Sequence, residues 1–327
     1  LTSSGQLTGI ETADLNGDGF LDFVASDFFH IVHVSLGNGD GSFRASVSYP
    51  AGFTVYDLDI ADFNGDGIMD IASAGVTSRS VGILLGNGDG TFQSIITYDT
   101  VFQANTVAHG DVNGDGILDI VASSGTQGLV FLGTGNGSFA PKVRFQFQGS
   151  NQELQIADFN GDGKADIAGI GTFGPNSRIA LILGNGDGSF NTASTINIEQ
   201  GLDGEIADFN GDGILDVASA SLSGVIISTA TGQGTFAAGV TYLMSGSAGS
   251  VVTGDINGDG KTDILAYRTD GSLQTLLGNG NGTFAAGYSF ATSQFAYTAT
   301  LGDFNGDGVL DYYSSDNGGD IFRLGSK

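Results

Sequence analysis

The sequence predicts an all-β protein that folds as a seven-bladed β-propeller, with four antiparallel strands per blade and a seventh blade that is incomplete or completed by another segment. Three observations support this prediction. One acidic loop of nine residues occurs seven times, its copies lie about 48 residues apart, and short apolar segments separated by turn residues fill the intervals. A fixed period of this length indicates one repeated unit, and four strands in roughly 40–50 residues is typical of a propeller blade. We expect a single domain over residues 1–327.

The segment 56–98 is one such repeat. It contains four short apolar segments of alternating polarity and almost no helical pattern, which indicates four strands. The acidic loop joins the first strand to the second. A glycine-rich turn joins the third strand to the fourth, and it begins at Gly37, Gly86, Gly133, Gly184, Gly232 and Gly278. Because three of these turns lack the aspartate of the others, we interpret them as hairpin turns rather than second metal sites.

The acidic loops have the composition of calcium sites. Every copy follows Asp-x-Asn-Gly-Asp-Gly-x-x-Asp. In the first copy we expect side-chain ligands from Asp14, Asn16, Asp18 and Asp22 and a backbone carbonyl ligand from Phe20. Ca²⁺ binds about six to eight oxygens and suits a flexible protein cage better than Mg²⁺ does. Glycines at the fourth and sixth positions permit the left-handed backbone of a curled loop. The seventh residue varies freely, as a carbonyl ligand allows.

The same positions in all seven loops (14–22, 62–70, 111–119, 158–166, 208–216, 255–263 and 303–311) predict up to seven Ca²⁺ ions. Besides those of the first loop, the predicted ligands are Asp62, Asn64, Asp66, Ile68, Asp70, Asp111, Asn113, Asp115, Ile117, Asp119, Asp158, Asn160, Asp162, Lys164, Asp166, Asp208, Asn210, Asp212, Ile214, Asp216, Asp255, Asn257, Asp259, Lys261, Asp263, Asp303, Asn305, Asp307, Val309 and Asp311. Three carboxylates in nine residues repel one another without a counter-ion, and we expect no basic residue nearby to relieve them.

Other interpretations of the loops explain less. A plain Asp-Asn-Gly turn accounts for one copy but not for seven that keep every ligand position. An EF-hand needs a bidentate Glu at the twelfth position, where the seven copies have only Ala, Ser or Gly. Zinc and copper sites are disfavoured because the chain has no Cys and its three His lie away from the loops.

The composition also limits the partners. A formal net charge of −26 would repel nucleic acid and anionic membranes, so we expect neither nucleic-acid binding nor membrane insertion. No apolar run is long enough to span a membrane. The chain begins at Leu1 without Met, which suggests that a signal peptide or a neighbouring region was removed. We therefore expect a secreted, extracellular or cell-surface protein.

The acidic loop, the apolar strand after it and the glycine-rich turn together resemble the FG-GAP/VCBS repeats of integrin α-subunit heads and of many secreted bacterial proteins. The resemblance covers all seven repeats. It implies a seven-bladed propeller with Ca²⁺ between the first two strands of a blade, although integrin heads hold such sites in only some blades. Related lectin-like propellers imply sugar binding between blades, but their tryptophan-rich character is missing because this chain has no Trp.

The two faces of the predicted propeller differ in sequence. Up-and-down strands place the acidic loops and the glycine-rich turns on one face, where the sequence hardly varies. The second turns and the blade-to-blade connections lie on the opposite face, here called the variable face, which is free to hold a ligand site. Its candidate ligand contacts are Phe28, Phe29, Phe102, Phe173, Arg178 and Arg268. The alternative is that these are ordinary loop residues whose rings fold inward.

We expect an adhesion or recognition module for a protein or glycan at a cell surface or matrix. The alternative is a structural function, as a building block of an extracellular filament or surface layer or as a non-catalytic spacer of a larger secreted protein. We expect no enzyme, because the histidines are scattered and no nucleophile elbow, phosphate-binding glycine loop or carboxylate pair is evident.

The seventh repeat, counted from Asp303 to the chain end and from the chain start to Asp14, is about ten residues shorter than the others. Aligned with them, it lacks its own glycine-rich turn and most of its outer strand. We expect another strand to fill this exposed edge, donated by a flanking region of a longer polypeptide or by a neighbouring subunit. Alternatively, Leu1–Thr8 swings outward and closes the blade.

Overall fold

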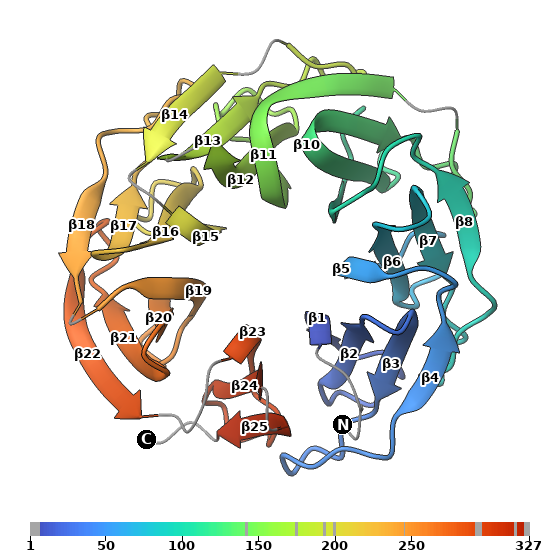
Figure 1. Ribbon diagram of the computed structural model, residues 1–327, viewed down its shortest axis with the longest axis horizontal. Helices are drawn as coiled ribbons and strands as arrows, with labels where there is room; N and C mark the ends of the chain where they lie inside the picture. The colour runs from blue at the N-terminus through green and yellow to red at the C-terminus, as the bar shows by residue number, and fades with distance from the viewer. Residues whose placement is uncertain are drawn as a thin grey trace.

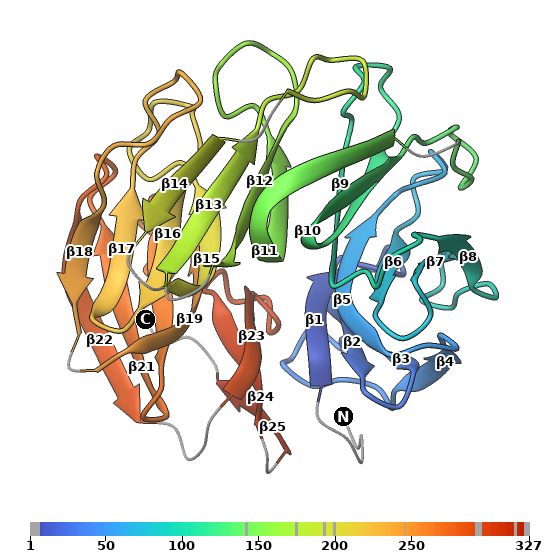
Figure 2. The ribbon, with the colours of Figure 1, turned by 45° about the horizontal axis from the view of Figure 1, so that its top comes forward.

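The computed structural model describes residues 7–140, 143–173, 176–191, 194–198, 201–244, 246–291, 296–316 and 319–323. Within them all regular secondary structure is β, and no helix is long and apolar enough to cross a membrane. The strands form radial sheets around a central opening (Figure 1), and the tilted view shows these sheets standing side by side in the ring (Figure 2). We number them as blades one to seven in chain order.

Blades one and two each have four antiparallel strands in sequence order. Blade one consists of β1 (Leu7–Ala13), β2 (Asp22–Asp27), β3 (Ile31–Ser35) and β4 (Val47–Pro50), and blade two of β5 (Val55–Ala61), β6 (Asp70–Gly75), β7 (Ser80–Leu84) and β8 (Ile96–Asp99). The second strand of each blade is buried along its whole length, because neighbouring blades cover both of its faces.

Blades three and four share one six-stranded sheet. Its strands are β9 (Thr106–Gly110), β10 (Asp119–Phe131), β11 (Val143–Ala157), β12 (Asp166–Phe173), β13 (Asn176–Ile182) and β14 (Ser194–Ile198). By repeat position, β10 combines the second and third strands of blade three. The long β11 pairs with β10 through its first part and with β12 through its second part, so it joins the two blades.

Blades five and six have four strands and blade seven has three among the described residues. Their strands are β15 (Gly201–Ala207), β16 (Asp216–Ser221), β17 (Gly224–Ser228), β18 (Val240–Leu243), β19 (Ala248–Gly254), β20 (Asp263–Arg268), β21 (Ser272–Gly278), β22 (Phe284–Ala291), β23 (Ala296–Gly302), β24 (Asp311–Asp316) and β25 (Gly319–Arg323). The predicted seven-bladed architecture is confirmed, with four strands by repeat position in each of the first six blades and three described strands in blade seven. Leu7 and Thr8 belong to β1, while residues 1–6, which the alternative closure of blade seven also needs, lie outside the described residues.

Apolar cores lie between neighbouring blades. Alternate residues of β2 point to opposite faces, so Phe23 and Ala25 pack with Phe304 and Tyr313 of blade seven, whereas Val24 packs in the core shared with blade two. The ring centroids of Phe23 and Tyr313 are 4.4 Å apart. Burial of these apolar side chains therefore joins the first blade to the last and closes the ring.

The connections that lead into blade two and into blade three each contribute a buried phenylalanine ring, here called an aromatic plug. Phe53 precedes β5, Phe102 has the same repeat position before β9, and both rings are buried. A Cβ atom added at Gly75 would lie 2.6 Å from the Phe53 ring, and one at Gly82 would lie 2.9 Å from it, so these glycines leave room for the plug. The corresponding residue before β1 is Gly5. The sequence thus provides no aromatic plug for blade one.

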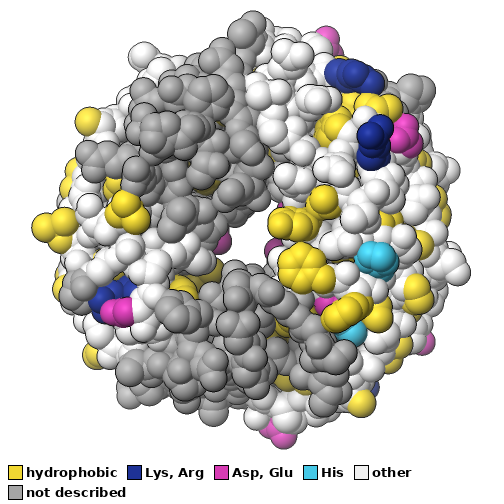
Figure 3. All heavy atoms as spheres, viewed as in Figure 1, with side chains coloured by type: hydrophobic (Ala, Val, Ile, Leu, Met, Phe, Trp, Pro, Cys, Tyr) yellow, Lys and Arg dark blue, Asp and Glu magenta, His cyan; other side chains and the backbone are white. Residues whose placement is uncertain are grey.

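The central opening has an acidic wall, which is visible as acidic side chains around the hole in Figure 3. Burial and the charges of Asp57, Asp59 and Glu205 raise the pKa of Glu11 well above its ordinary value. Asp59 Oδ2 also lies 2.8 Å from His109 Nδ1. These residues come from blades one, two, three and five, so carboxylates of separate blades share one electrostatic environment.

Candidate metal centres

The predicted metal ligands lie in the loops between the first and second strands of the blades, and the ninth residue is the first residue of the second strand. In the first loop, Asp14 Oδ1 accepts hydrogen bonds from the backbone N–H of Gly17 at 2.8 Å and of Asp18 at 3.2 Å, and its Oδ2 accepts from Gly19 at 2.8 Å. Both glycines have positive φ angles, 73° and 87°. Glycine is required there because other residues rarely adopt this left-handed backbone.

The next two side chains of the loop also accept backbone hydrogen bonds. Asn16 Oδ1 accepts from the N–H of Asp18 at 2.8 Å, and Asp18 Oδ1 accepts from the N–H of Phe20 at 3.0 Å. The same two bonds recur in the other loops. Each loop is therefore curled around its own side-chain oxygens, which is how Asp and Asn stabilise turns.

The ninth residue, here called the closing aspartate, is fully buried in every loop. Asp22 Oδ2 accepts from the N–H of Leu15 in the same loop at 2.8 Å, and its Oδ1 accepts from the N–H of Gly37 at 2.8 Å. Equivalent pairs of bonds are present at Asp70, Asp119, Asp166, Asp216 and Asp263. The closing aspartate thus ties the acidic loop to the glycine-rich turn of its blade.

The glycine-rich turns connect the third and fourth strands, as predicted. Their first residue pairs with a phenylalanine six residues later, as in the bridge between Gly133 and Phe139. A Cβ atom at Gly133 would lie only 2.2 Å from the carbonyl oxygen of Leu118, which explains the glycine. In blade five the bridge begins at Ala230, so the predicted start of that turn at Gly232 is wrong by two residues.

The acidic loops and the glycine-rich turns share one face, as predicted, and they connect neighbouring blades. Gly188 N donates to the carbonyl oxygen of Val112 in the loop of the preceding blade, at 3.2 Å. Gly41 N donates at 3.0 Å to the carbonyl oxygen of Phe304, which lies in the loop of blade seven. The contact that joins successive blades therefore also closes the ring. We call this side of the molecule the loop face.

Burial raises the pKa to about 6 at four closing aspartates: Asp70, Asp119, Asp166 and Asp216. The two backbone N–H donors lower the pKa, and the charges of two other aspartates in the same loop raise it. In these four loops the third carboxylate is therefore ionised at an electrostatic cost in the metal-free protein.

The expectation that no basic residue relieves the loops is wrong for three of them. Lys261 Nζ lies 3.3 Å from Asp259 Oδ2, and Lys164 Nζ lies 3.9 Å from Asp162 Oδ2. Arg44 Nη2 lies 4.0 Å from Asp18 Oδ2 in the first loop. These pairs are exposed, so solvent screens them and each contributes little to stability.

The residues present fit an oxygen-binding cation. Among the described residues no three acidic or histidine side chains converge as tightly as metal ligands do. In the first loop Asn16 Nδ2 donates to Asp18 Oδ2 at 3.0 Å, so these exposed side chains bond to each other. Each carboxylate oxygen that accepts one N–H retains a further lone pair. The carboxylate, amide and backbone carbonyl oxygens of each loop are the hard ligands that such a cation takes.

In the first six loops the seventh residue packs outward over the turn of its own blade. A Cβ atom at Gly88 would lie 3.0 Å from Ile68 Cδ1, and one at Gly186 would lie 3.2 Å from the Lys164 side chain. These side chains are therefore directed away from the loop interior, which leaves the backbone carbonyl as the group that can serve a cation. The second strands begin at the ninth residue, so the twelfth position lies within a strand, unlike in an EF-hand.

On the variable face the predicted ligand contacts separate into different environments. Phe28 and Phe29 are exposed, by 42% and 62%, on the turn between β2 and β3. Phe102 is wrong as a surface contact, since it is only 9% exposed and belongs to the core between blades two and three. Phe173 lies in β12 and Arg178 in β13, but their side chains lie outside the described residues.

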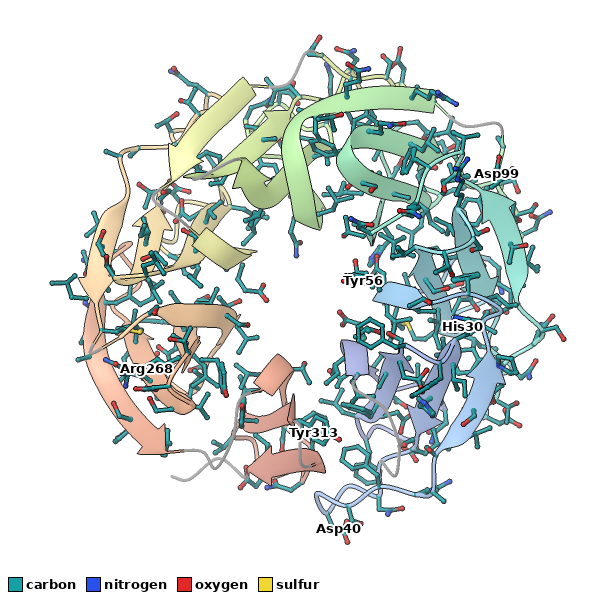
Figure 4. All side chains as sticks on the ribbon, viewed as in Figure 1. His30, Asp40, Tyr56, Asp99, Arg268 and Tyr313 are labelled. Atoms are coloured by element: carbon teal, nitrogen blue, oxygen red, sulfur yellow. The ribbon has the colours of Figure 1, made fainter. Side chains whose placement is uncertain are left out.

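Arg268 is also wrong as a free surface contact. It is 7% exposed, and its guanidinium donates to Ser272 Oγ at 2.8 Å and lies 2.7 Å from Asp270 Oδ2. The short turn after β20 therefore engages this arginine within blade six, at the position labelled in Figure 4. Its charge stabilises the turn rather than being presented to solvent.

Sequence reasoning missed Tyr56. Its ring is 48% exposed beside the central opening (Figure 4) and makes an edge contact with Phe28, with centroids 6.2 Å apart. The feature that could have identified it is the β-bulge between Val55 and Asp57, where the alternation of side chains along the strand is interrupted. We call Phe28, Phe29 and Tyr56 the aromatic cluster.

We expect Asp119→Ala to destabilise the metal-free protein by about 2–6 kcal/mol, because two buried N–H donors, those of Val112 and Gly133, lose their acceptor. Asp115→Ala in the same loop is the control, since Asp115 is exposed. Urea unfolding of both variants in excess chelator measures the difference. Equal losses of stability would contradict the role of the closing aspartate.

The metal-free protein should become more stable as the pH falls from 7 to 5. Closing aspartates titrate near pH 6 in the folded protein and near 4 in the unfolded chain, so the folded state takes up protons first. Urea unfolding in excess chelator at pH 7, 6 and 5 tests this. A free energy of unfolding that decreases steadily over this range would contradict it.

Phe102→Ala should lower the free energy of unfolding by about 3–5 kcal/mol, because it empties a buried aromatic site. Phe29→Ala, at an exposed ring, should change it by less than about 0.5 kcal/mol. Denaturant unfolding of the two variants under the same conditions makes the comparison. An unchanged free energy of unfolding in Phe102→Ala would contradict the burial of this ring and favour the predicted surface contact.

The comparisons agree with this architecture. An FG-GAP-like repeat model matches residues 14–73, 62–122, 111–169, 158–219, 208–266 and 255–314. No curated protein matches the sequence significantly. A lectin of Agrocybe aegerita, described as recognising non-reducing terminal N-acetylglucosamine, is similar in structure with a TM-score of 0.63 and 22% identity, over 96% of this chain and 86% of the lectin.

Two structures of BBS1N in complex with ARL6DN are also similar. One, soaked with mercury, has a TM-score of 0.67 and 13% identity over 98% of this chain and 92% of the other. The second, soaked with lead, has a TM-score of 0.69 and 11% identity over 99% and 94%. At such identities these likenesses show the fold alone. The family matches, which run from residue 14 to residue 314, show that the chain belongs to the FG-GAP-like repeat family.

Proposed function

We propose that this protein is a secreted, calcium-binding recognition module that binds a protein or glycan through its variable face. In this proposal the loop face is structural and holds one Ca²⁺ per blade. The variable face differs from blade to blade and makes the specific contacts. Binding is the proposed activity of both faces.

Calcium is supported by the chemistry of the loops. Each offers three carboxylates, one amide oxygen and one backbone carbonyl, all hard oxygen donors, on a loop with two left-handed glycines. The raised pKa of the closing aspartates means that a cation would remove an electrostatic penalty. Ca²⁺ accepts such flexible protein cages, whereas Mg²⁺ demands a tighter octahedral geometry and retains more water.

The observation that carries the recognition proposal is the exposed aromatic cluster. Two of its members, Phe28 and Tyr56, come from different blades and meet edge to face, with Tyr56 beside the central opening. In Figure 3 hydrophobic side chains gather on this side of the opening. Exposed rings at one place on a divergent face are typical of ligand contacts, because aromatic side chains supply much binding energy with few rotatable bonds.

The structural neighbours support both kinds of ligand. The Agrocybe aegerita lectin is described as recognising a terminal N-acetylglucosamine, and BBS1N is described in complex with ARL6DN. A propeller of this shape therefore serves glycan recognition in one protein and occurs in a protein complex in another. An aromatic ring can stack on a sugar or fill a protein pocket, so the same cluster suits either ligand.

Removal of Ca²⁺ should lower the melting temperature substantially. Each independent site stabilises the folded state by about 2.7 kcal/mol when free Ca²⁺ is about 100 times its Kd. Asp111→Ala should remove one site and leave the other six loaded, since each loop supplies its own ligands. Calorimetry with and without chelator, together with metal counting by mass spectrometry, measures both effects.

The matched control is Asp40→Ala. Asp40 lies in a glycine-rich turn on the same face and accepts from Ser42, so its loss should leave the metal count unchanged. A melting temperature that is the same with and without chelator would refute the calcium proposal.

The double variant Phe28→Ala/Phe29→Ala should weaken ligand binding by about tenfold or more, as removal of a central aromatic contact does, with little change in the melting temperature of the calcium-loaded protein. A glycan array and a pull-down from extracellular matrix extract supply the two classes of ligand. Tyr288→Ala is the control, because Tyr288 is 65% exposed on the outer strand β22, away from the cluster. Binding that survives in the double variant would place the site elsewhere.

A further inference from the structure

Three side chains of blade one form a hydrogen-bonded chain across β2, β3 and β4. Asp27 Oδ2 lies 3.0 Å from His33 Nε2, and Ser48 Oγ lies 3.2 Å from His33 Nδ1. His33 and Ser48 are direct partners on the adjacent strands β3 and β4. We call these residues the Asp–His–Ser group. It is separate from the metal loops, and on the variable face it borders the aromatic cluster, because Asp27 directly precedes Phe28.

The partners determine which imidazole nitrogen holds the proton. An ionised carboxylate only accepts hydrogen bonds, so His33 Nε2 donates to Asp27. In the neutral imidazole Nδ1 then has the free lone pair and accepts from the hydroxyl of Ser48. A serine hydroxyl that donates to a carboxylate-oriented histidine is the arrangement that activates a nucleophile.

The Asp–His–Ser group is held in place at Asp27 and is open to solvent at Ser48. Asp27 and His33 are buried, and Asp27 Oδ1 accepts from the N–H of Phe29 at 2.8 Å and of Ile31 at 3.1 Å, which fixes the carboxylate. Ser48 is exposed on β4, the outermost strand of its sheet. The nucleophile can therefore meet a substrate from solvent while its base stays oriented.

The group is particular to blade one. In blade two the equivalent positions hold Gly75, Gly82 and Thr97, and the plug Phe53 covers both glycines. Blade one has polar side chains where blade two has the space for its aromatic plug. The repeated architecture therefore does not require these three residues, which makes a chemical role worth testing.

We propose that Ser48 is an activated nucleophile that accepts acyl groups from small activated esters, with His33 as general base and Asp27 as the residue that positions His33. Ser48 Oγ bonds to the ester carbonyl carbon while its proton passes to His33 Nδ1. The tetrahedral carbon then expels the alkoxide, which takes this proton and leaves as an alcohol. Water attacks the acyl-serine with the same base and restores the hydroxyl, releasing a carboxylic acid.

The expected acceleration of acyl transfer is set by these three residues. A positioned histidine base typically contributes about 10²–10⁴-fold. The outer edge of β4 pairs with no strand in the described part of the chain, so a small ester can approach Ser48 from that side.

A fluorophosphonate reagent is the direct probe, because a serine oxygen displaces its fluoride and forms a stable adduct. We expect the adduct to form on Ser48 at least about tenfold faster than on Ser46, an exposed serine two residues earlier in the chain. Intact mass and peptide mapping of the whole protein measure both rates. Equal rates at the two serines would overturn the proposal.

Substitutions test whether His33 acts as the general base for Ser48. Ser48→Ala should abolish the fast adduct, and His33→Gln should slow it by about 100-fold or more. His30→Ala, which removes another histidine of the same blade, and Thr97→Ala, at the equivalent position of blade two, should leave the rate unchanged. An unchanged rate in a folded His33→Gln variant would also overturn the proposal.

A test of Asp27 needs a measurement that would stay the same if this residue had only a structural role. Nitrogen chemical shifts of His33 should show the Nε2–H tautomer in the unaltered protein. Asp27→Asn should shift the population toward the Nδ1–H tautomer and slow adduct formation with it. An Nδ1–H tautomer in the unaltered protein would contradict the proposed base, whatever the folding of the variants.

Discussion

The structure depends on one repeated interaction, the closing aspartate buried between an acidic loop and a glycine-rich turn. One of its oxygens accepts a backbone N–H of the loop and the other accepts the first N–H of the turn, as at Asp119 with Val112 and Gly133. The shared carboxylate fixes both, and the turns then bond to the loops of preceding blades, as Gly188 does to Val112. Its charge makes the same residue an electrostatic cost unless a cation is close.

This constraint separates the two faces. On the loop face most positions are determined by the carboxylate, the left-handed glycines and the contact with the next blade, so the repeats remain nearly identical. The opposite ends of the blades carry no such constraint, and there the repeats differ in what fills the same space. Blade two encloses an aromatic plug at Phe53, whereas blade one holds Asp27 and His33. Both proposed chemistries, recognition at the aromatic cluster and reactivity at Ser48, use this freedom.

Much of the fold could be predicted because its signals are local and repeated: the loop spacing, the strand alternation and the turn glycines. The start of the turn in blade five was predicted two residues too late, because Ala230 and not a glycine takes the position of the first glycine in the other turns. Side-chain environment on the variable face was harder to predict. Phe102 and Phe29 look alike in sequence, yet one enters a core and the other stays in solvent because of packing between blades. The Asp–His–Ser group joins residues of three strands, a relation that only the strand register reveals.

Hydrogen exchange at the amides of Val112 and Gly133 tests the central interaction most directly, since both donate to Asp119. If the closing aspartate ties the loop to the turn, these two amides should exchange only through large-scale unfolding, and removal of Ca²⁺ should speed both together by the amount that it lowers global stability. Amides of the exposed tip around Asn136, in the same turn, should exchange fast in either state. Rapid exchange at Val112 and Gly133 in the calcium-loaded protein, at the rate of that tip, would contradict the account.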